Sequence, residues 1–123
     1  MNNISELSVY EIVGSPLCVA SSDGQKVHDR LSTALKEGQN VTLSFRNVAI
    51  LTSAFLNTAI GQLYGTFSEE QIRTLLKVRD MEQDDIALLR RVVDTAKLYF
   101  HDPSRFSQVI RETMGDEDYG RDD

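Results

Sequence analysis

The chain has 123 residues, of which 41% are apolar, and its formal net charge at pH 7 is −6. This length corresponds to one domain, and the single cysteine, Cys18, excludes an intrachain disulfide and indicates a reducing compartment. Residues 1–6 lack the basic and apolar regions of a signal peptide, and no apolar stretch approaches the ~20 residues that span a bilayer. We therefore expect a cytoplasmic protein that makes no contact with membranes.

The negative charge is concentrated at the C-terminal end. Residues 115–123, GDEDYGRDD, carry a net charge of −4, and the rest of the chain has no basic surface. Affinity for nucleic acid depends on Lys and Arg side chains that face phosphates, so we expect no nucleic-acid partner. We predict a domain over residues 1–102, a helical extension over 103–114 and a disordered acidic tail over 115–123, which cannot bury enough apolar surface to offset its ordering entropy.

The first forty residues predict two strands and a helix. Alternation over residues 7–13, LSVYEIV, predicts a strand, and a Gly-Ser-Pro turn separates it from a short apolar strand over residues 17–20 that could complete a hairpin. Short polar side chains over residues 21–24 resemble a helix cap, and apolar residues then recur at helical spacing. Gly38 is expected to end this helix, because glycine adopts the left-handed conformation easily.

The middle of the chain predicts a central strand followed by a helix. The strand covers residues 41–45, VTLSF, which alternate between apolar and polar side chains. The apolar run at residues 48–51 leads to Thr52 and Ser53, where cap residues begin a helix that we expect to end at Tyr64–Gly65.

Three more elements complete the predicted domain. They are a short helix from Ser68 to about Arg73, a strand over residues 75–78, and a long helix from Asp84–Asp85 that stops before Asp102–Pro103. A short amphipathic segment follows over residues 106–114. A strand, crossover helix and strand imply a right-handed parallel pair. With the first strand antiparallel to some of the others, we predict an α/β fold with a mixed β-sheet of about four strands packed with three to four helices.

Residues 41–64, VTLSFRNVAILTSAFLNTAIGQLY, resemble the central segment of STAS domains, which occur in sulphate transporters and anti-sigma-factor antagonists. In those domains a strand and a short apolar run lead into a helix opened by Asp-Ser-(Ser/Ala)-Gly. The chain is more closely similar to a bacterial family, the STAS-like domain of unknown function, over about residues 7–101. Its shared strand and helix-start motifs correspond here to Val41, Leu43, Phe45, Thr52, Ser53, Phe55 and Leu56.

This resemblance implies a STAS-like α/β module that regulates a protein partner, such as a histidine-kinase-like ATPase. In STAS domains such an ATPase phosphorylates the motif serine and thereby breaks the complex. Ser53 stands at the position of that serine, whereas Thr52 replaces the motif aspartate and Phe55 replaces the glycine. The resemblance makes Ser53 and Thr52 the expected phosphoacceptor or anion site. Phe55, Leu56 and Asn57 are the candidates for contact with the partner.

Each of these residues also has a purely structural interpretation. One of the hydroxyls of Thr52 and Ser53 could simply cap the helix. Phe55 and Leu56 point about 100° apart on a helix, so both are buried only if the apolar stripe is wide. The sequence leaves open whether these four side chains form a docking site or only cap and fill the domain.

No set of residues predicts catalysis. Cys18 lacks a CxxC partner, and His28 and His101 lie far from it along the chain, so no base is assigned to activate the thiol. Two histidines and one cysteine are too few for a structural zinc site, and no phosphate-binding loop is present. The acidic residues before the long helix lack the glycine and distal glutamate of a calcium loop, and helix-start electrostatics explains them: Asp80, Glu82, Asp84 and Asp85.

We therefore predict a non-catalytic protein-binding module with no cofactor and no metal. A non-catalytic subunit of a bacterial defence or toxin-neutralising complex is the alternative, and a homodimer is compatible with either function. A small enzyme that uses Cys18, His28 or the acidic residues is the third hypothesis.

Overall fold

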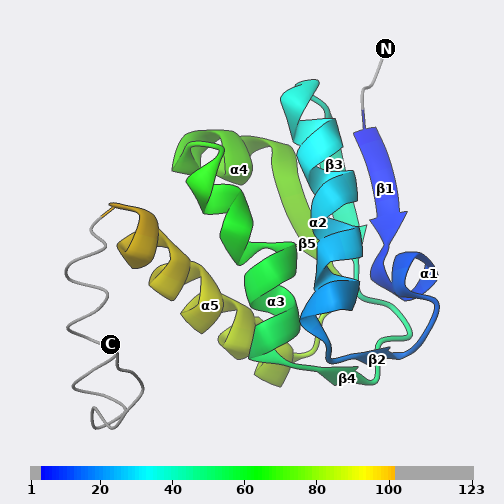
Figure 1. Cartoon of the computed structure of the whole chain (residues 1–123). Helices are drawn as coiled ribbons and strands as arrows, with labels where there is room; N and C mark the ends of the chain where they lie inside the picture. The colour runs from blue at the N-terminus through cyan, green and yellow to red at the C-terminus, as the bar shows by residue number, and fades with distance from the viewer. Residues whose placement is uncertain (1–3, 102–123) are drawn as a thin grey trace, which may run out of the picture.

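The fold is α/β, as predicted, in a computed structural model that describes residues 4–101 (Figure 1). The predicted segment 103–114 and the acidic tail lie outside the described residues. The elements in chain order are β1 (Ile4–Ser8), α1 (Val9–Val13), β2 (Leu17–Cys18), α2 (Ser21–Lys36), β3 (Asn40–Ser44), β4 (Ile50–Leu51), α3 (Ser53–Ala59), the 3₁₀ helix η1 (Gly61–Gly65), α4 (Glu69–Leu75), β5 (Leu76–Arg79) and α5 (Gln83–His101).

The strands form two small sheets, one with the order β1-β3-β5 and one that pairs β2 with β4. Every pair among the described strands is parallel, so the prediction of a mixed sheet, with the first strand antiparallel to others, is wrong for this part of the chain. The physical reason is that β1 and β2 do not form a hairpin. Helix α1 separates them, and β1 pairs instead with β3 after the crossover that contains α2.

The predicted strand over residues 7–13 is the largest local difference. The strand β1 ends at Ser8, whose hydroxyl accepts a hydrogen bond from the Glu11 backbone N–H at 3.1 Å and caps α1. Gly14 closes this helix in the left-handed conformation, with φ of 81°. The alternation of Leu7 and Val9 with polar neighbours is real, but the serine cap and the glycine stop make the second half of the segment one helical turn.

The second difference lies in the helix predicted from Thr52 to Tyr64. Helix α3 ends at Ala59, and the chain continues as the tighter η1. Gly61 and Gly65 bound η1, and glycine is a weak helix former. A Cβ atom at Gly65 would lie 2.6 Å from the Phe100 ring, so the glycine allows α5 to pack closely there.

Two smaller differences concern α2 and β4. Helix α2 begins after Ala20, which forms no side-chain cap hydrogen bond, so the cap predicted over residues 21–24 is wrong, and part of the apolar run at residues 48–51 is the strand β4.

The remaining elements agree with the predicted pattern. Helix α2 buries the expected apolar positions, and Gly38 follows it in the left-handed conformation with φ of 71°. The predicted strand at residues 41–45 is β3, the central strand of its sheet. Ser68 and Gln71 form a reciprocal capping box that begins α4.

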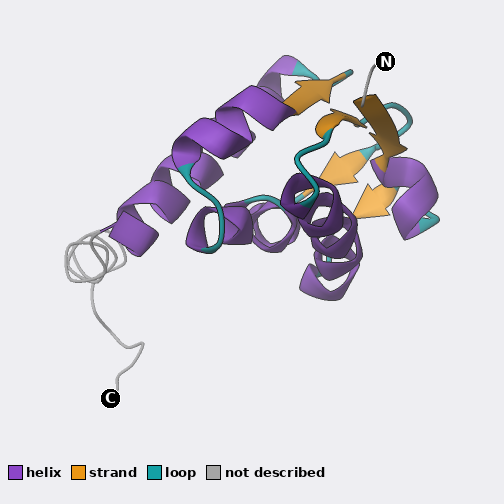
Figure 2. Ribbon diagram, turned by 90° about the horizontal axis from the view of Figure 1, so that it is seen from above, coloured by secondary structure: helices purple, strands orange, loops and turns teal. Residues whose placement is uncertain are grey.

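The core lies between the three-stranded sheet and the helices. Figure 1 shows α2 and α3 in front of the sheet with α5 beyond α3, and Figure 2 shows the same layers from above. The six largest fully buried side chains come from α2, β3, α3 and η1, and they are Leu31, Leu35, Leu43, Phe55, Leu56 and Leu63. The opposite face of the sheet carries three polar residues that are register partners on neighbouring strands: Glu6, Thr42 and Lys77. The apolar face of the three-stranded sheet is therefore covered by helices from one side.

Candidate functional site

Helix α3 begins at a junction with the two-stranded β2–β4 sheet. Thr52 has an extended backbone, and its hydroxyl accepts from the Phe55 N–H at 3.1 Å and donates to the Val19 carbonyl at 2.7 Å. The Thr52 N–H also donates to the Cys18 carbonyl at 3.2 Å. The cap predicted for one of the two hydroxyls is therefore provided by Thr52, which ties the first turn of α3 to the end of β2.

Ser53, the next residue, is in a different environment. Its side chain is exposed, and its hydroxyl forms no hydrogen bond with the residues that the structure describes. Ala54 and Asn57 are also exposed, so the amino end of α3 lies at the molecular surface. Because Thr52 already satisfies the capping requirement, the Ser53 hydroxyl is accessible to another molecule.

Phe55 and Leu56 are fully buried, with no exposed surface. The prediction that their side chains contact a partner is wrong for this structure, and the alternative that both belong to the core holds. The reason is that α3 packs against α2 on one side and α5 on another, so its buried stripe is wide enough for two adjacent residues.

An exposed apolar surface does occur beside α3, on the β2–β4 sheet. Leu17 and Ile50 are each 50% exposed and are register partners, and Val19 just after β2 is 45% exposed. Cys18 between them is fully buried. We call Leu17, Val19 and Ile50 the ribbon face. The sequence predicted a short apolar strand over residues 17–20 and only an apolar run over residues 48–51. The alternation of side chains along a strand would have placed every second residue outside.

The side chains that were candidates for catalysis do not come together in one site. Burial, and to a smaller extent the charge of Asp23, raises the pKa of the Cys18 thiol to about 11. Its hydrogen-bond partner is the Ser15 carbonyl at 4.0 Å, and no histidine within residues 4–101 hydrogen-bonds to it. His101 Nδ1 lies 3.6 Å from Glu69 Oε2, which links α5 to α4.

The acidic residues before α5 also separate into different environments. Asp84 and Asp85 lie in the first turn of α5, as helix-start electrostatics predicts, whereas Asp80 accepts a hydrogen bond from the Ser44 hydroxyl at 2.8 Å. Within residues 4–101, no group of three or more His, Cys, Asp or Glu side chains is arranged to hold a metal ion.

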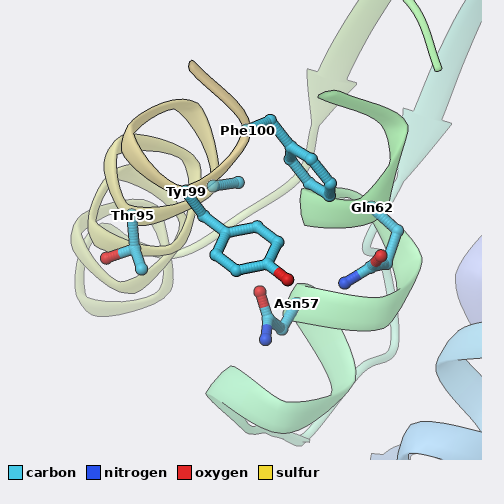
Figure 3. Close-up of a pocket in the computed structure, with 6 residues that line it drawn as sticks. Asn57, Gln62, Thr95, Tyr99 and Phe100 are labelled. Atoms are coloured by element: carbon cyan, nitrogen blue, oxygen red, sulfur yellow. The ribbon is translucent and has the colours of Figure 1, made fainter. Parts of the chain in front are cut away.

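Asn57 belongs to a second surface, a cavity of about 250 Å³ between α3, η1 and the end of α5. Figure 3 shows the Asn57 and Gln62 amides and the Tyr99 ring around this cavity, with the Tyr99 hydroxyl directed toward Asn57. Its lining also includes Thr95 and Phe100 and carries no charged side chain. Of the predicted partner contacts, only Asn57 is accessible, and it faces away from the core.

A family model described as a STAS-like domain of unknown function matches residues 23–85, from the first turn of α2 to the start of α5. No curated protein and no solved structure matches the chain significantly. None of the helices in residues 4–101 is long and apolar enough to cross a membrane. The matched segment covers half of the chain and contains β3, β4, the Thr52 cap and α3. The chain therefore belongs to the family of STAS-like domains of unknown function.

Proposed function

We propose that this protein is a regulatory module that binds another protein through the start of α3 and the ribbon face, and that phosphorylation of Ser53 weakens this binding. The observation that carries the proposal is the exposed Ser53 hydroxyl, free of hydrogen bonds within residues 4–101, on the helix start that Thr52 joins to the ribbon face. The resemblance to anti-sigma-factor antagonists makes a histidine-kinase-like ATPase the expected partner.

The ribbon face supports a protein partner because its three apolar side chains are contiguous. Leu17 and Ile50 are paired across the two strands, and Val19 is two residues beyond Leu17 on the same face. Burial of apolar area contributes about 25 cal/mol per Å², and clustered exposed apolar side chains mark interaction surfaces. Depletion of charge at the centre of such a surface is typical of protein interfaces.

Phosphorylation would act on this surface through charge and solvation. A phosphate on Ser53 adds a dianion beside the apolar ribbon face, and binding would then require its desolvation or a compensating cation from the partner. The first-turn amides of α3 favour the added charge within the module itself. The modified chain is therefore expected to stay folded while its affinity for the partner falls.

The test uses the full chain with a histidine-kinase-like ATPase from the organism that encodes it, purified and titrated by calorimetry. We expect Ser53→Glu and Leu17→Asp each to weaken binding about tenfold or more, and Ser53→Ala and the remote surface variant Arg91→Gln to leave it unchanged. Phosphorylation by the ATPase is followed by mass spectrometry at Ser53. Circular dichroism confirms that each variant is folded.

Three results would contradict the proposal. Equal affinity of Ser53→Glu and Ser53→Ala would exclude the phosphorylation switch. Unchanged affinity of Leu17→Asp would exclude the ribbon face as the contact surface. If the wild-type chain sediments as a dimer that Leu17→Asp dissociates, the ribbon face binds a second copy of the chain, and the ATPase is not its partner.

A further inference from the structure

A second polar cavity, of about 320 Å³, lies at the carboxyl ends of β1, β3 and β5. Arg46 from the segment after β3, Arg79 and Asp80 from the end of β5, and Tyr10 and Glu11 from α1 contribute to its lining. In open α/β sheets, ligands bind outside the carboxyl ends of parallel strands. The cavity thus lies at the edge of the sheet where such ligands bind, and it does not include Ser53 or the ribbon face.

The backbone at this cavity is strained at two positions. Asn47, with φ of 70°, and Asp80, with φ of 62°, are the non-glycine residues with positive φ in the described part of the chain, and both line the cavity. Such conformations are energetically unfavourable for most residues and cluster at ligand-binding and active sites. Neither position uses glycine, which would relieve the strain.

Hydrogen bonds and ion pairs hold the centre of the cavity in place. The buried Ser44 hydroxyl donates to Asp80 Oδ2 at 2.8 Å and accepts from the Arg46 backbone N–H at 3.2 Å. Arg79 pairs with Glu6 and lies 3.6 Å from Asp80 through Nε. The Ser44 hydrogen bond, aided by the charges of Arg79 and Arg46, lowers the pKa of Asp80. Three charged side chains of the cavity are therefore already paired with other residues: Glu6, Arg79 and Asp80.

Two charged side chains of the cavity remain without such partners. Neither the Arg46 guanidinium nor the Glu11 carboxylate forms an ion pair with any residue between 4 and 101. A purely anionic ligand would pair with Arg46 but be repelled by Glu11, and a purely cationic ligand would meet the reverse situation. A ligand that carries both charges satisfies both side chains.

We propose that this cavity binds a small zwitterion, a free amino acid, whose carboxylate pairs with Arg46 and whose ammonium group pairs with Glu11. The volume of 320 Å³ equals that of about ten water molecules, which is enough for a ligand of this size. The ring of Tyr10, which is 37% exposed, offers apolar surface to the side chain of the ligand. This site is independent of the proposed docking surface on α3 and the ribbon face.

The first experiment titrates the full chain with the common L-amino acids and follows backbone amide resonances by NMR. We expect at least one of them to shift the resonances of residues 44–47 and 79–80 with a dissociation constant of about 1 mM or tighter. The N-acetyl and the carboxamide derivatives of that amino acid, which each lack one charge, should bind about tenfold more weakly or worse, since each loses one charged hydrogen bond.

The second experiment repeats the titration with variants. Arg46→Gln and Glu11→Gln should each lower the affinity about tenfold, whereas Arg91→Gln, on the exposed side of α5, should not change it. Arg46→Gln should in addition bind the N-acetyl derivative no better than the free amino acid. Thermal unfolding checks that the variants remain folded.

The proposal is overturned if no amino acid shifts these resonances at concentrations of about 10 mM, well above the expected dissociation constant. It is overturned as well if the N-acetyl derivative binds as tightly as the free amino acid, since the cavity would then be a simple anion site. If Glu11→Gln binds the free amino acid as tightly as the wild type does, the contact between Glu11 and the ammonium group is excluded and the proposal is overturned.

Discussion

Adjacent residues in this protein have opposite environments, and their structural roles differ accordingly. Thr52 is committed to two hydrogen bonds that fix the start of α3, while the hydroxyl of Ser53 is exposed to solvent. Leu17 is half exposed, while Cys18 beside it is fully buried. Backbone geometry causes both contrasts, because successive side chains point to opposite faces of a strand and about 100° apart on a helix.

The reactivity of Cys18 tests this view at the scale of one residue. Because burial raises its thiol pKa from 9.0 to about 11, the native chain at pH 8 should contain roughly 100-fold less thiolate than the unfolded chain. Alkylation by iodoacetamide should be slower by at least this factor in buffer than in concentrated guanidinium chloride. The rate is measured by mass spectrometry of the intact protein, and equal rates in the two conditions would contradict the burial of Cys18.

The same shift predicts a dependence of stability on alkaline pH. The pKa of Cys18 is higher in the folded state than in the unfolded state, so folding favours the protonated thiol. Its contribution is complete below about pH 9 and is lost as pH rises toward about 11. The free energy of unfolding of the wild type should therefore fall more steeply over this range than that of Cys18→Ala. Parallel curves for the two chains would contradict the prediction.

At the scale of secondary-structure elements, β2 and β4 depend on their surroundings. Each strand has two residues, and an isolated pair of this length is not stable in water. Hydrogen bonds from the Ala49 and Ile50 N–H groups to the Pro16 carbonyl hold one end of the pair, and Thr52 holds the other. The ribbon face therefore depends on the α3 cap for its position.

Substitution of Thr52 should show this dependence. Thr52→Ala removes both hydroxyl hydrogen bonds and should lower the free energy of unfolding by about 0.5–2 kcal/mol, the usual range for loss of a helix cap. Thr52→Ser keeps the hydroxyl and should lose less. Ser53→Ala should change stability by no more than about 0.5 kcal/mol, as exposed substitutions do. The values are measured by urea unfolding, and similar losses for Thr52→Ala and Ser53→Ala would refute the assignment of the cap.

The sequence predicted most elements, and the two largest differences lie in segments where competing signals are present. In residues 7–13 the period of two favours a strand, and the Ser8 cap with Gly14 favours a helical turn that the structure adopts. In residues 52–64 the apolar spacing favours one helix, but the chain tightens into η1, where Gly65 lets the Phe100 ring of α5 approach. The formation of η1 depends on a contact with a helix that is distant in the chain. A local sequence pattern does not reveal such a contact.

At the scale of the whole molecule, the close approach of α2 and α3 determines how the helical layer covers the sheet. Gly24 of α2 lies against the backbone of α3, and a Cβ atom there would be 2.5 Å from the Phe55 carbonyl oxygen and 3.2 Å from Cβ of Thr58. The carbonyl belongs to the backbone of a packed helix and cannot move aside as a flexible side chain could. Gly24 is buried, so the contact is part of the core.

We expect Gly24→Ala to destabilise the protein by about 1–3 kcal/mol, the usual range for overpacking. For a domain of this size each kcal/mol corresponds to about 4–8 °C in Tm. In an exposed helix the same change would be stabilising by about 1 kcal/mol. The sign of the change in stability therefore shows whether Gly24 is in close contact with α3. Ser22→Ala, an exposed position on the same helix, is the matched control and should be nearly neutral. A higher Tm for Gly24→Ala in a calorimetric scan would show that the helices do not touch at this point.

The sequence by itself determined the α/β class, the family and most helix boundaries, and it identified Thr52 and Ser53 as the start of a helix. It could do so because caps, glycine stops and apolar periodicity are local signals. Tertiary structure alone decided the parallel pairing of β1 with β3, the burial of Phe55 and Leu56, and the exposure of the ribbon face. It also brought Glu11, Arg46 and Asp80 to one cavity. These features depend on contacts between segments far apart in the chain, and no local pattern encodes which segments meet.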